Sequence, residues 1–143
     1  MAEVTVRLGA WDAMRAHAEP LRTEVFVNEQ KVPAEIEIDA WDPQCVHALA
    51  FDADGTALGT GRLLPDGHIG RMAVRKSARG QGVGTALLRA LMQEAARRGH
   101  REVVLSAQTH AVPFYAREGF RCEGPVYDDA GIPHVDMRRA LSG

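Results

Sequence analysis

The sequence has few of the features that mark specialised protein classes. Two cysteines, Cys45 and Cys122, occur among its 143 residues, which indicates reduced thiols and argues against a disulfide framework. No apolar run approaches the roughly 20 residues that a membrane-spanning helix needs. The opening residues MAEVTVRLGA lack the basic and apolar regions of a signal peptide. We therefore expect a cytoplasmic protein with no membrane partner.

Charge of one sign is also scarce. The chain has 17 lysine and arginine residues against 19 aspartate and glutamate residues, a net charge of -2, so a general attraction to nucleic acid is not expected. Its histidine, cysteine and acidic residues show no metal-ligand spacing, so we expect no metal site. The length and a hydrophobic content of 45% predict a single domain over residues 1–143.

What the sequence does contain is one stretch, residues 68–99, with the pattern of an anion site. An apolar strand is expected over 69–74, a basic, glycine-rich turn over 75–84, and then a helix up to residue 98, whose apolar residues recur every three or four positions. Free N–H groups of such a turn point outward, and the helix dipole favours negative charge there. The sequence therefore predicts a phosphate or pyrophosphate site.

The remaining chain alternates between strand and helix patterns. Strands are expected over 4–8, 46–51, 57–64, 102–107, 120–127 and 133–139, with a helix over 11–27 that is interrupted near Pro20 and a short one over 108–118. Residues 34–40 alternate like a strand, but Pro33 and Pro43 bracket them, so an extended loop is equally compatible. The strands on either side of the central helix form a βαβ unit, which predicts local parallel pairing.

Two common nucleotide-binding motifs do not fit the glycine turn. A P-loop needs a lysine followed by serine or threonine after its last glycine, whereas Gly84 is followed by Thr85 and Ala86. A dinucleotide fingerprint would have a third glycine where Thr85 stands, and the next strand ends without a carboxylate for a ribose.

The segment RGQGVG, residues 79–84, instead resembles the R/Q-x-x-G-x-G/A motif of the GCN5-related N-acetyltransferase (GNAT) superfamily. The segment FYAREGF, residues 114–120, is similar to the second motif of that superfamily. The segments RTEVFVNEQ, residues 22–30, and GIPH, residues 131–134, resemble its ElaA/YjcF-type subgroup. The resemblance implies an α/β (α+β) fold: a mixed, mostly antiparallel sheet of about seven strands, splayed between strands 4 and 5 and flanked by about four helices.

The resemblance also implies acetyl-CoA as cosubstrate, with its pyrophosphate on the glycine turn and its pantetheine arm beside the fourth strand. The residues that it assigns to the cofactor are Met72, Ala73, Val74, Arg79, Gly80, Gln81, Gly82, Val83, Gly84, Thr85, Gln108 and Phe114.

The two catalytic residues that we expect are Tyr115 and His134. A phenol with a reference pKa of about 10 stays protonated at neutral pH, so Tyr115 could protonate the leaving thiolate, as the resemblance implies; the alternative is a tyrosine that only packs in the core. Many members of the superfamily carry a glutamate base on the fourth strand, where this chain has Arg71 and no carboxylate. The remaining base candidates are Glu29, Glu37, His47, His110 and His134, with His134 preferred because the final hairpin tends to border the acceptor site.

The function that we expect is acetyl transfer from acetyl-CoA to a primary amine of a small molecule or peptide by direct attack. The alternatives are a non-catalytic acyl-CoA-binding module and a nucleotide-binding domain. The acidic run Glu35, Glu37, Asp39 and Asp42 is interpreted either as an attractor for a cationic amine or as a solvated loop face. Trp11 and Trp41 are expected in the core or under loops, and exposed final strands are compatible with a homodimer.

Overall fold

We describe residues 4–141 of the chain in a computed structural model. The strands are β1 (Thr5–Ala10), β2 (Val46–Phe51), β3 (Ala57–Leu63), β4 (Ile69–Val74), β5 (Glu102–Gln108), β6 (Arg121–Asp129) and β7 (Ile132–Ala140). The helices are α1 (Trp11–Arg22), α2 (Ala34–Glu37), α3 (Val83–Arg97) and α4 (Val112–Arg117). A π-helical segment, η1 (Thr23–Glu29), follows α1, and three 3-10 turns lie at Asp42–Gln44 (η2), Lys76–Ala78 (η3) and Thr109–Ala111 (η4).

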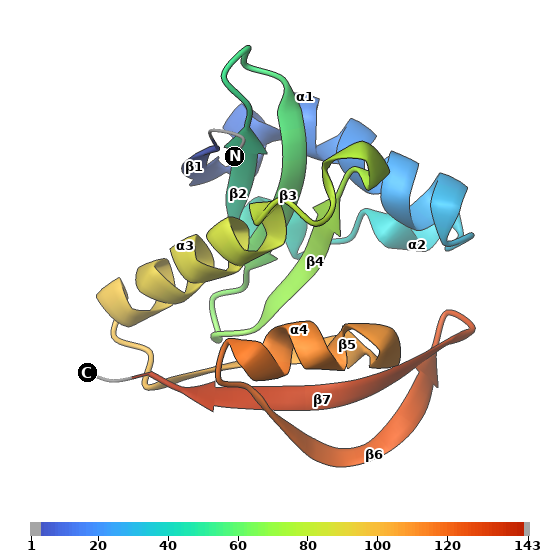
Figure 1. Ribbon diagram of the computed structural model, residues 1–143, viewed down its shortest axis with the longest axis vertical. Helices are drawn as coiled ribbons and strands as arrows, with labels where there is room; N and C mark the ends of the chain where they lie inside the picture. The colour runs from blue at the N-terminus through green and yellow to red at the C-terminus, as the bar shows by residue number, and fades with distance from the viewer. Residues whose placement is uncertain (1–3, 142–143) are drawn as a thin grey trace.

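The strands form two sheets that are joined, among the described residues, by one isolated β-bridge. One sheet has the order β1-β2-β3-β4 and the other β5-β7-β6, and all their paired neighbours are antiparallel. The link between them is an isolated parallel bridge from His68 to Val104, where the Val104 N–H donates to the Gly67 carbonyl at 3.3 Å. Beyond this bridge β4 and β5 diverge (Figure 1). The predicted fold class is confirmed, splay included, but the predicted parallel pairing is limited to one bridge.

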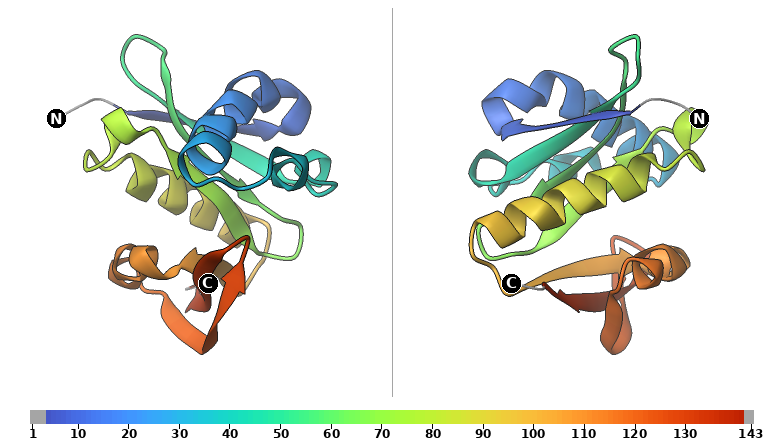
Figure 2. Two further views of the ribbon diagram at one scale, coloured as in Figure 1. Left: turned by 90° about the vertical axis from the view of Figure 1, so that its right-hand side faces the viewer. Right: turned by 60° about the vertical axis from the view of Figure 1, so that its left-hand side comes forward.

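Helices cover the first sheet on both faces, as the two views of Figure 2 show for α1 and α3. The apolar side of α3, with Leu87, Leu88 and Leu91 fully buried, joins residues of both sheets in one core cluster. On the opposite face α1 contributes Trp11 and Leu21 to a smaller cluster with the β2 and β3 strands. The helix α3 therefore holds the two sheets together while leaving β4 and β5 apart at their far ends.

Two predictions along the first half of the chain are wrong. The helix α1 runs through Pro20 without a break and ends at Arg22, where the Thr23 N–H donates to the carbonyls of Glu19 and Pro20. Residues 34–40 are neither a strand nor a fully extended loop, because Pro33 is followed by the short helix α2. The alternating pattern there has another cause: Glu37 is buried against charged partners, whereas Ile36 is exposed.

The other predicted strands and turns are confirmed with shifts at their ends, including the hairpin between β6 and β7. The helix predicted over 108–118 is split, because β5 extends to Gln108 and a 3-10 turn precedes α4. Trp11 is buried as expected, but Trp41 is 48% exposed, which contradicts the prediction. Both cysteines are free. No helix within residues 4–141 is long and apolar enough to cross a bilayer.

Candidate functional site

The glycine turn leads directly into the exposed N-terminus of α3. Gly80 and Gly82 have positive φ angles of 78° and 81°, and a Cβ at either position would meet no atom within 4 Å. The first hydrogen bond of the helix runs from the Ala86 N–H to the Gly82 carbonyl at 3.0 Å. Within the described chain, no side chain caps this end and no acidic residue lies in its first turn. The amides of residues 83–85 are therefore available to an anion, which the helix dipole favours.

At the end of the turn, Phe114 of α4 packs against Gly84. A Cβ on Gly84 would lie 3.3 Å from the Phe114 Cζ atom, so glycine allows Phe114 to sit directly on the beginning of α3. The predicted cofactor residues at the turn, Gln81, Val83 and Thr85 included, thus lie at one end of α3 beside the predicted Phe114.

Two arginines flank the turn, and both are bound to acidic residues of η1. Arg79 donates to the two carboxylate oxygens of Glu29 at 2.6 and 2.8 Å, and its Nε donates to the Val74 carbonyl at 3.0 Å. Arg75 donates to Glu24 at 2.9 Å. These pairs are largely solvent-exposed, so they contribute little to stability and an anion could replace them. They also exclude Glu29 as a free base in this state.

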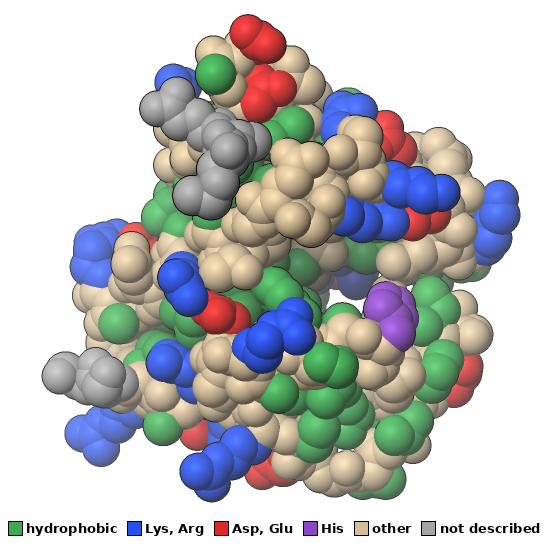
Figure 3. Space-filling view, viewed as in Figure 1, with side chains coloured by type: hydrophobic (Ala, Val, Ile, Leu, Met, Phe, Trp, Pro, Cys, Tyr) green, Lys and Arg blue, Asp and Glu red, His purple; other side chains and the backbone are tan. Residues whose placement is uncertain are grey.

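The strand β4 has one paired and one open edge. Ala73 and Val74 pair with Thr60 and Gly59 of β3. On the side of β5, the described residues show no pairing beyond His68. Figure 3 shows a hollow between the part of the molecule that carries β1–β4 and the part that carries β5–β7. Among the described residues, the outer edge of Met72–Val74 therefore has no strand partner, and its place beside a pantetheine arm stays a prediction.

Tyr115 of α4 is 9% exposed, and its ring packs edge-on against Phe114 and Phe120. Its hydroxyl has no hydrogen-bond partner among residues 4–141. Burial raises the pKa of Tyr115 to about 12, so the phenol stays protonated through the neutral range. Its chemistry thus fits a proton donor, although its ring also serves the core.

His134 and Gln108 face each other across β7 and β5. The Nδ1 atom of His134 lies 2.8 Å from the Ile132 carbonyl, which can only accept, so Nδ1 carries the proton and Nε2 is left with a free electron pair. The Gln108 side-chain amide donates to the Gln30 Oε1 at 2.7 Å. Gln30 was absent from the predicted site, although it ends the RTEVFVNEQ segment that carried the resemblance.

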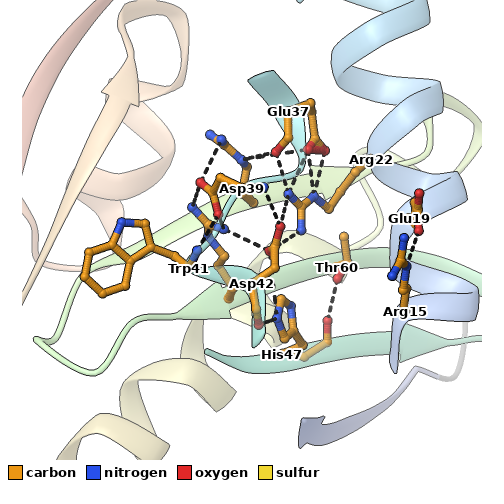
Figure 4. A network of polar contacts seen from close by, with 12 residues as sticks. Arg15, Glu19, Arg22, Glu37, Asp39, Trp41, Asp42, His47 and Thr60 are labelled. Carbon is orange, nitrogen blue, oxygen red and sulfur yellow. Dashed lines mark hydrogen bonds and ion pairs between the residues drawn. The ribbon is translucent and has the colours of Figure 1, made fainter. Parts of the chain in front are cut away.

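The acidic run belongs to a buried ion-pair network between α1, the α2 region and the strands β3 and β4 (Figure 4). Neither predicted interpretation, an attractor for amines or a solvated face, is correct. The network consists of Arg22, Glu37, Asp39, Asp42, Arg62 and Arg71. The ion pairs join residues that lie 15 to 34 positions apart, so the local sequence pattern of the acidic run does not reveal the network. Of the run, only Glu35 lies outside the network, and it is exposed.

Burial opposes the ionisation of Asp39, but hydrogen bonds and charge from Arg62 outweigh it and lower the pKa of Asp39 to about 2. Burial likewise lowers the pKa of His47, whose Nε2 contacts the Asp42 carbonyl at 2.8 Å inside the protein. Glu37 is occupied by Arg22. Neither Glu37 nor His47 is therefore accessible as a base.

Arg71 lies on β4, the strand on which the resemblance implies a glutamate base. It has a positive φ of 49° at an irregularity in the pairing of β3 with β4. Its guanidinium donates to the Glu37 carbonyl at 3.2 Å and to Asp39 at 3.3 Å. The strand thus offers a positive group that is already tied to the ion-pair network. Of the predicted bases, His110 is exposed on η4, and His134 has a free nitrogen in a defined tautomer.

Comparisons with known proteins agree with this geometry. A family model described as "Acetyltransferase (GNAT) domain" matches residues 12–141. The chain is 42% identical over 123 residues to the uncharacterized N-acetyltransferase YjcF of Bacillus subtilis (strain 168), covering 83% of this chain and 87% of that protein. An acyl-CoA N-acyltransferase from Pseudomonas aeruginosa superposes with a TM-score of 0.85 at 36% identity, covering 96% and 100% of the two chains. Escherichia coli ElaA superposes with a TM-score of 0.84 at 28% identity, covering 96% and 99%.

Proposed function

Because this chain belongs to the GNAT acetyltransferase family, and to its ElaA/YjcF-like branch, we propose that it moves an acetyl group from acetyl-CoA to a primary amine of a small molecule or peptide. The amine attacks the thioester directly, and no covalent acyl-enzyme forms. The observation that carries this proposal is the uncapped N-terminus of α3 at the edge of the opening between β4 and β5.

The residues at this end of α3 fit the cofactor. Gly80 and Gly82 leave open space where a side chain would obstruct a diphosphate, and the amides of residues 83–85 have no competing side-chain partner in the described chain. Arg79 supplies positive charge once it exchanges Glu29 for phosphate. When bound, acetyl-CoA supplies the acetyl group as an activated thioester. The open edge of Met72–Val74 would hold the pantetheine arm, and Gln108 would border it.

Two side chains divide the proton transfers between them. Tyr115 donates a proton to the departing thiolate, a role that its raised pKa supports because the phenol is neutral at working pH. His134 accepts the proton of the attacking amine at Nε2, directly or through a water molecule, because its Nδ1 is committed to the Ile132 carbonyl. No carboxylate of the buried network takes part.

The proposed setting is a single cytoplasmic domain that needs no metal ion. The family match over residues 12–141 supports the extent of the domain. No group of three metal-ligating side chains occurs among residues 4–141. A homodimer stays a prediction from the sequence.

The test is release of free CoA from acetyl-CoA against a panel of amines, polyamines, amino acids and peptides, together with thermal-shift titrations of CoA, ATP and NAD. We expect stabilisation by CoA alone and amine-dependent CoA release. Stabilisation by CoA without transfer to any amine would favour the non-catalytic acyl-CoA-binding module. A shift with ATP or NAD comparable to that with CoA would contradict the proposed cofactor.

A further inference from the structure

We propose that Tyr127 of β6 is a positioning residue for His134, and that Asp136 and Ser106 in turn hold Tyr127. The inference rests on the proposed function, in which His134 is the base. It concerns three residues that neither the sequence patterns nor the family match assigns to the site.

The four side chains share one face of the second sheet. Ala107, Val135 and Met137 point into the core. Because side chains alternate along a strand, their neighbours Ser106, His134 and Asp136 point to the other face. Ser106 is opposite Asp136 in the pairing of β5 with β7, and Tyr127 is opposite His134 in the pairing of β6 with β7.

A bulge in β6 places the tyrosine there. Glu123 pairs with Asp136, and regular continuation of that register would put Pro125 opposite His134. The register shifts between Glu123 and Tyr127, where Gly124 has a φ of 83°, and Tyr127 takes that place instead. Bulges of this kind redirect side chains and are common beside active sites.

Both ends of the Tyr127 side chain are held. Its hydroxyl donates to the Asp136 carboxylate at 2.6 Å and also contacts the Ser106 hydroxyl. Its ring stacks on the His134 imidazole with 6.2 Å between centroids and 23° between planes. With the Nδ1 bond to Ile132, this contact fixes the plane of the imidazole and therefore the direction of the Nε2 electron pair.

The arrangement contributes little to the core. All of β6 is exposed, and Tyr127 itself is 38% exposed. A base, however, must be aligned with the proton that it accepts, and small misplacements reduce rates by up to ~100-fold. Tyr127 should therefore affect turnover far more than folding.

The experiment compares Tyr127→Leu, which removes the ring, with Tyr127→Phe, which keeps it, using Glu123→Gln on the same strand as the matched control. Tyr127→Leu should lower kcat by roughly 10- to 100-fold, with the KM for acetyl-CoA and the melting temperature nearly unchanged. Tyr127→Phe keeps the ring but loses the hydroxyl that Asp136 and Ser106 hold, so its kcat should lie between those of the wild type and Tyr127→Leu. Glu123→Gln should resemble the wild type. An unchanged kcat in Tyr127→Leu would overturn the proposal. So would a fall in melting temperature large enough to account for the loss of activity.

Two further measurements separate this proposal from the proposed function. In a His134→Gln background, Tyr127→Leu should cause no additional loss of kcat, whereas an independent second loss would show that Tyr127 does not act through His134. The imidazole ¹⁵N chemical shifts of His134 report its tautomer without any activity. They should show one Nδ1-protonated form in the wild type and a mixture in Tyr127→Leu. If wild type and variant give the same shifts, the positioning role is wrong even if the acetyltransferase is active.

Discussion

Arg22 on α1 donates hydrogen bonds to both carboxylate oxygens of Glu37 on α2, the shortest at 2.6 Å, and both side chains are buried. The same guanidinium reaches Asp42 at 2.6 Å and lies 5.4 Å from the centre of the Trp11 ring. One side chain of the first helix thus anchors the segment that follows η1. Since Arg71 of β4 binds the same segment, the network ties the first helix to the strand that borders the proposed site.

Removing one acidic member of this network should destabilise the fold. Asp42→Ala leaves Arg22 and Arg62 buried with too few partners, and breaking a buried ion pair in this way costs about 3–5 kcal/mol. Urea unfolding measures the difference. The matched control is Glu19→Gln, because Glu19 pairs with Arg15 in the solvent and such pairs contribute about 1 kcal/mol or less. Equal effects of the two variants would show that burial of the network does not matter.

The network should also make stability depend on acidity. The folded-state pKa of Asp39 is lowered to about 2, so its contribution is complete above the ordinary value of 3.8 and disappears as the pH falls toward 2. The difference in the free energy of unfolding between wild type and Asp39→Asn should therefore be constant from pH 7 to about 5. It should become smaller by about 1–2 kcal/mol toward pH 2. Denaturant unfolding at a series of pH values tests this. If this difference stays constant down to pH 2, the folded protein does not lower the pKa of Asp39.

Loss of the Tyr115 hydroxyl should affect turnover and little else. Tyr115→Phe keeps the ring that packs on Phe114 and Phe120, and the hydroxyl has no partner within the described chain, so the melting temperature should hardly change. Without its proton donor, kcat should fall about 100-fold, with CoA affinity retained. Steady-state CoA release and calorimetric binding give the two values. An unchanged kcat would leave Tyr115 as a core residue only.

The pair between Arg79 and Glu29 should compete with the cofactor. Glu29→Gln frees the Arg79 guanidinium, which should tighten CoA binding by a few-fold at low salt, as expected for an exposed ion pair. The effect should fade above physiological ionic strength because salt screens exposed charges. Calorimetric titration of CoA at two salt concentrations provides the comparison, with Glu19→Gln as the control. Weaker binding in Glu29→Gln would indicate that Glu29 instead holds Arg79 ready for phosphate.

The glycine turn and the helix of the proposed donor side could be predicted from the sequence because they depend on local chemistry. Gly80 and Gly82 adopt the positive φ angles that favour glycine, and the helix after them follows from the spacing of its leucines. The parallel pairing of β4 with β5, which the βαβ unit predicted, is by contrast limited to one bridge between His68 and Val104.

The buried ion-pair network and the placement of Tyr127 could not be predicted, because both depend on contacts between distant residues. The alternation of Glu37 and Asp39 indicates a strand until the buried Arg22 and Arg62 are taken into account. The placement of Tyr127 depends on a bulge, and a register shift leaves no periodic signal in one strand alone. Trp41 was expected in the core or under a loop, but it is exposed. Its neighbour Asp42 is buried instead, because it pairs with the buried Arg22.

The divergence of β4 from β5 has a consequence for solubility. Strand edges with unpaired amides are templates for aggregation, and proteins usually cover or charge them. Here the open edges of β4 and β5 face each other across the hollow of Figure 3, where a strand of another molecule would have to enter edge-on. Of the two outermost edges, β1 and β6, β6 is protected differently, by Pro125, its bulge and its charged residues. Under the proposed function, a backbone edge can thus stay free for the cofactor without being offered to another copy of the protein.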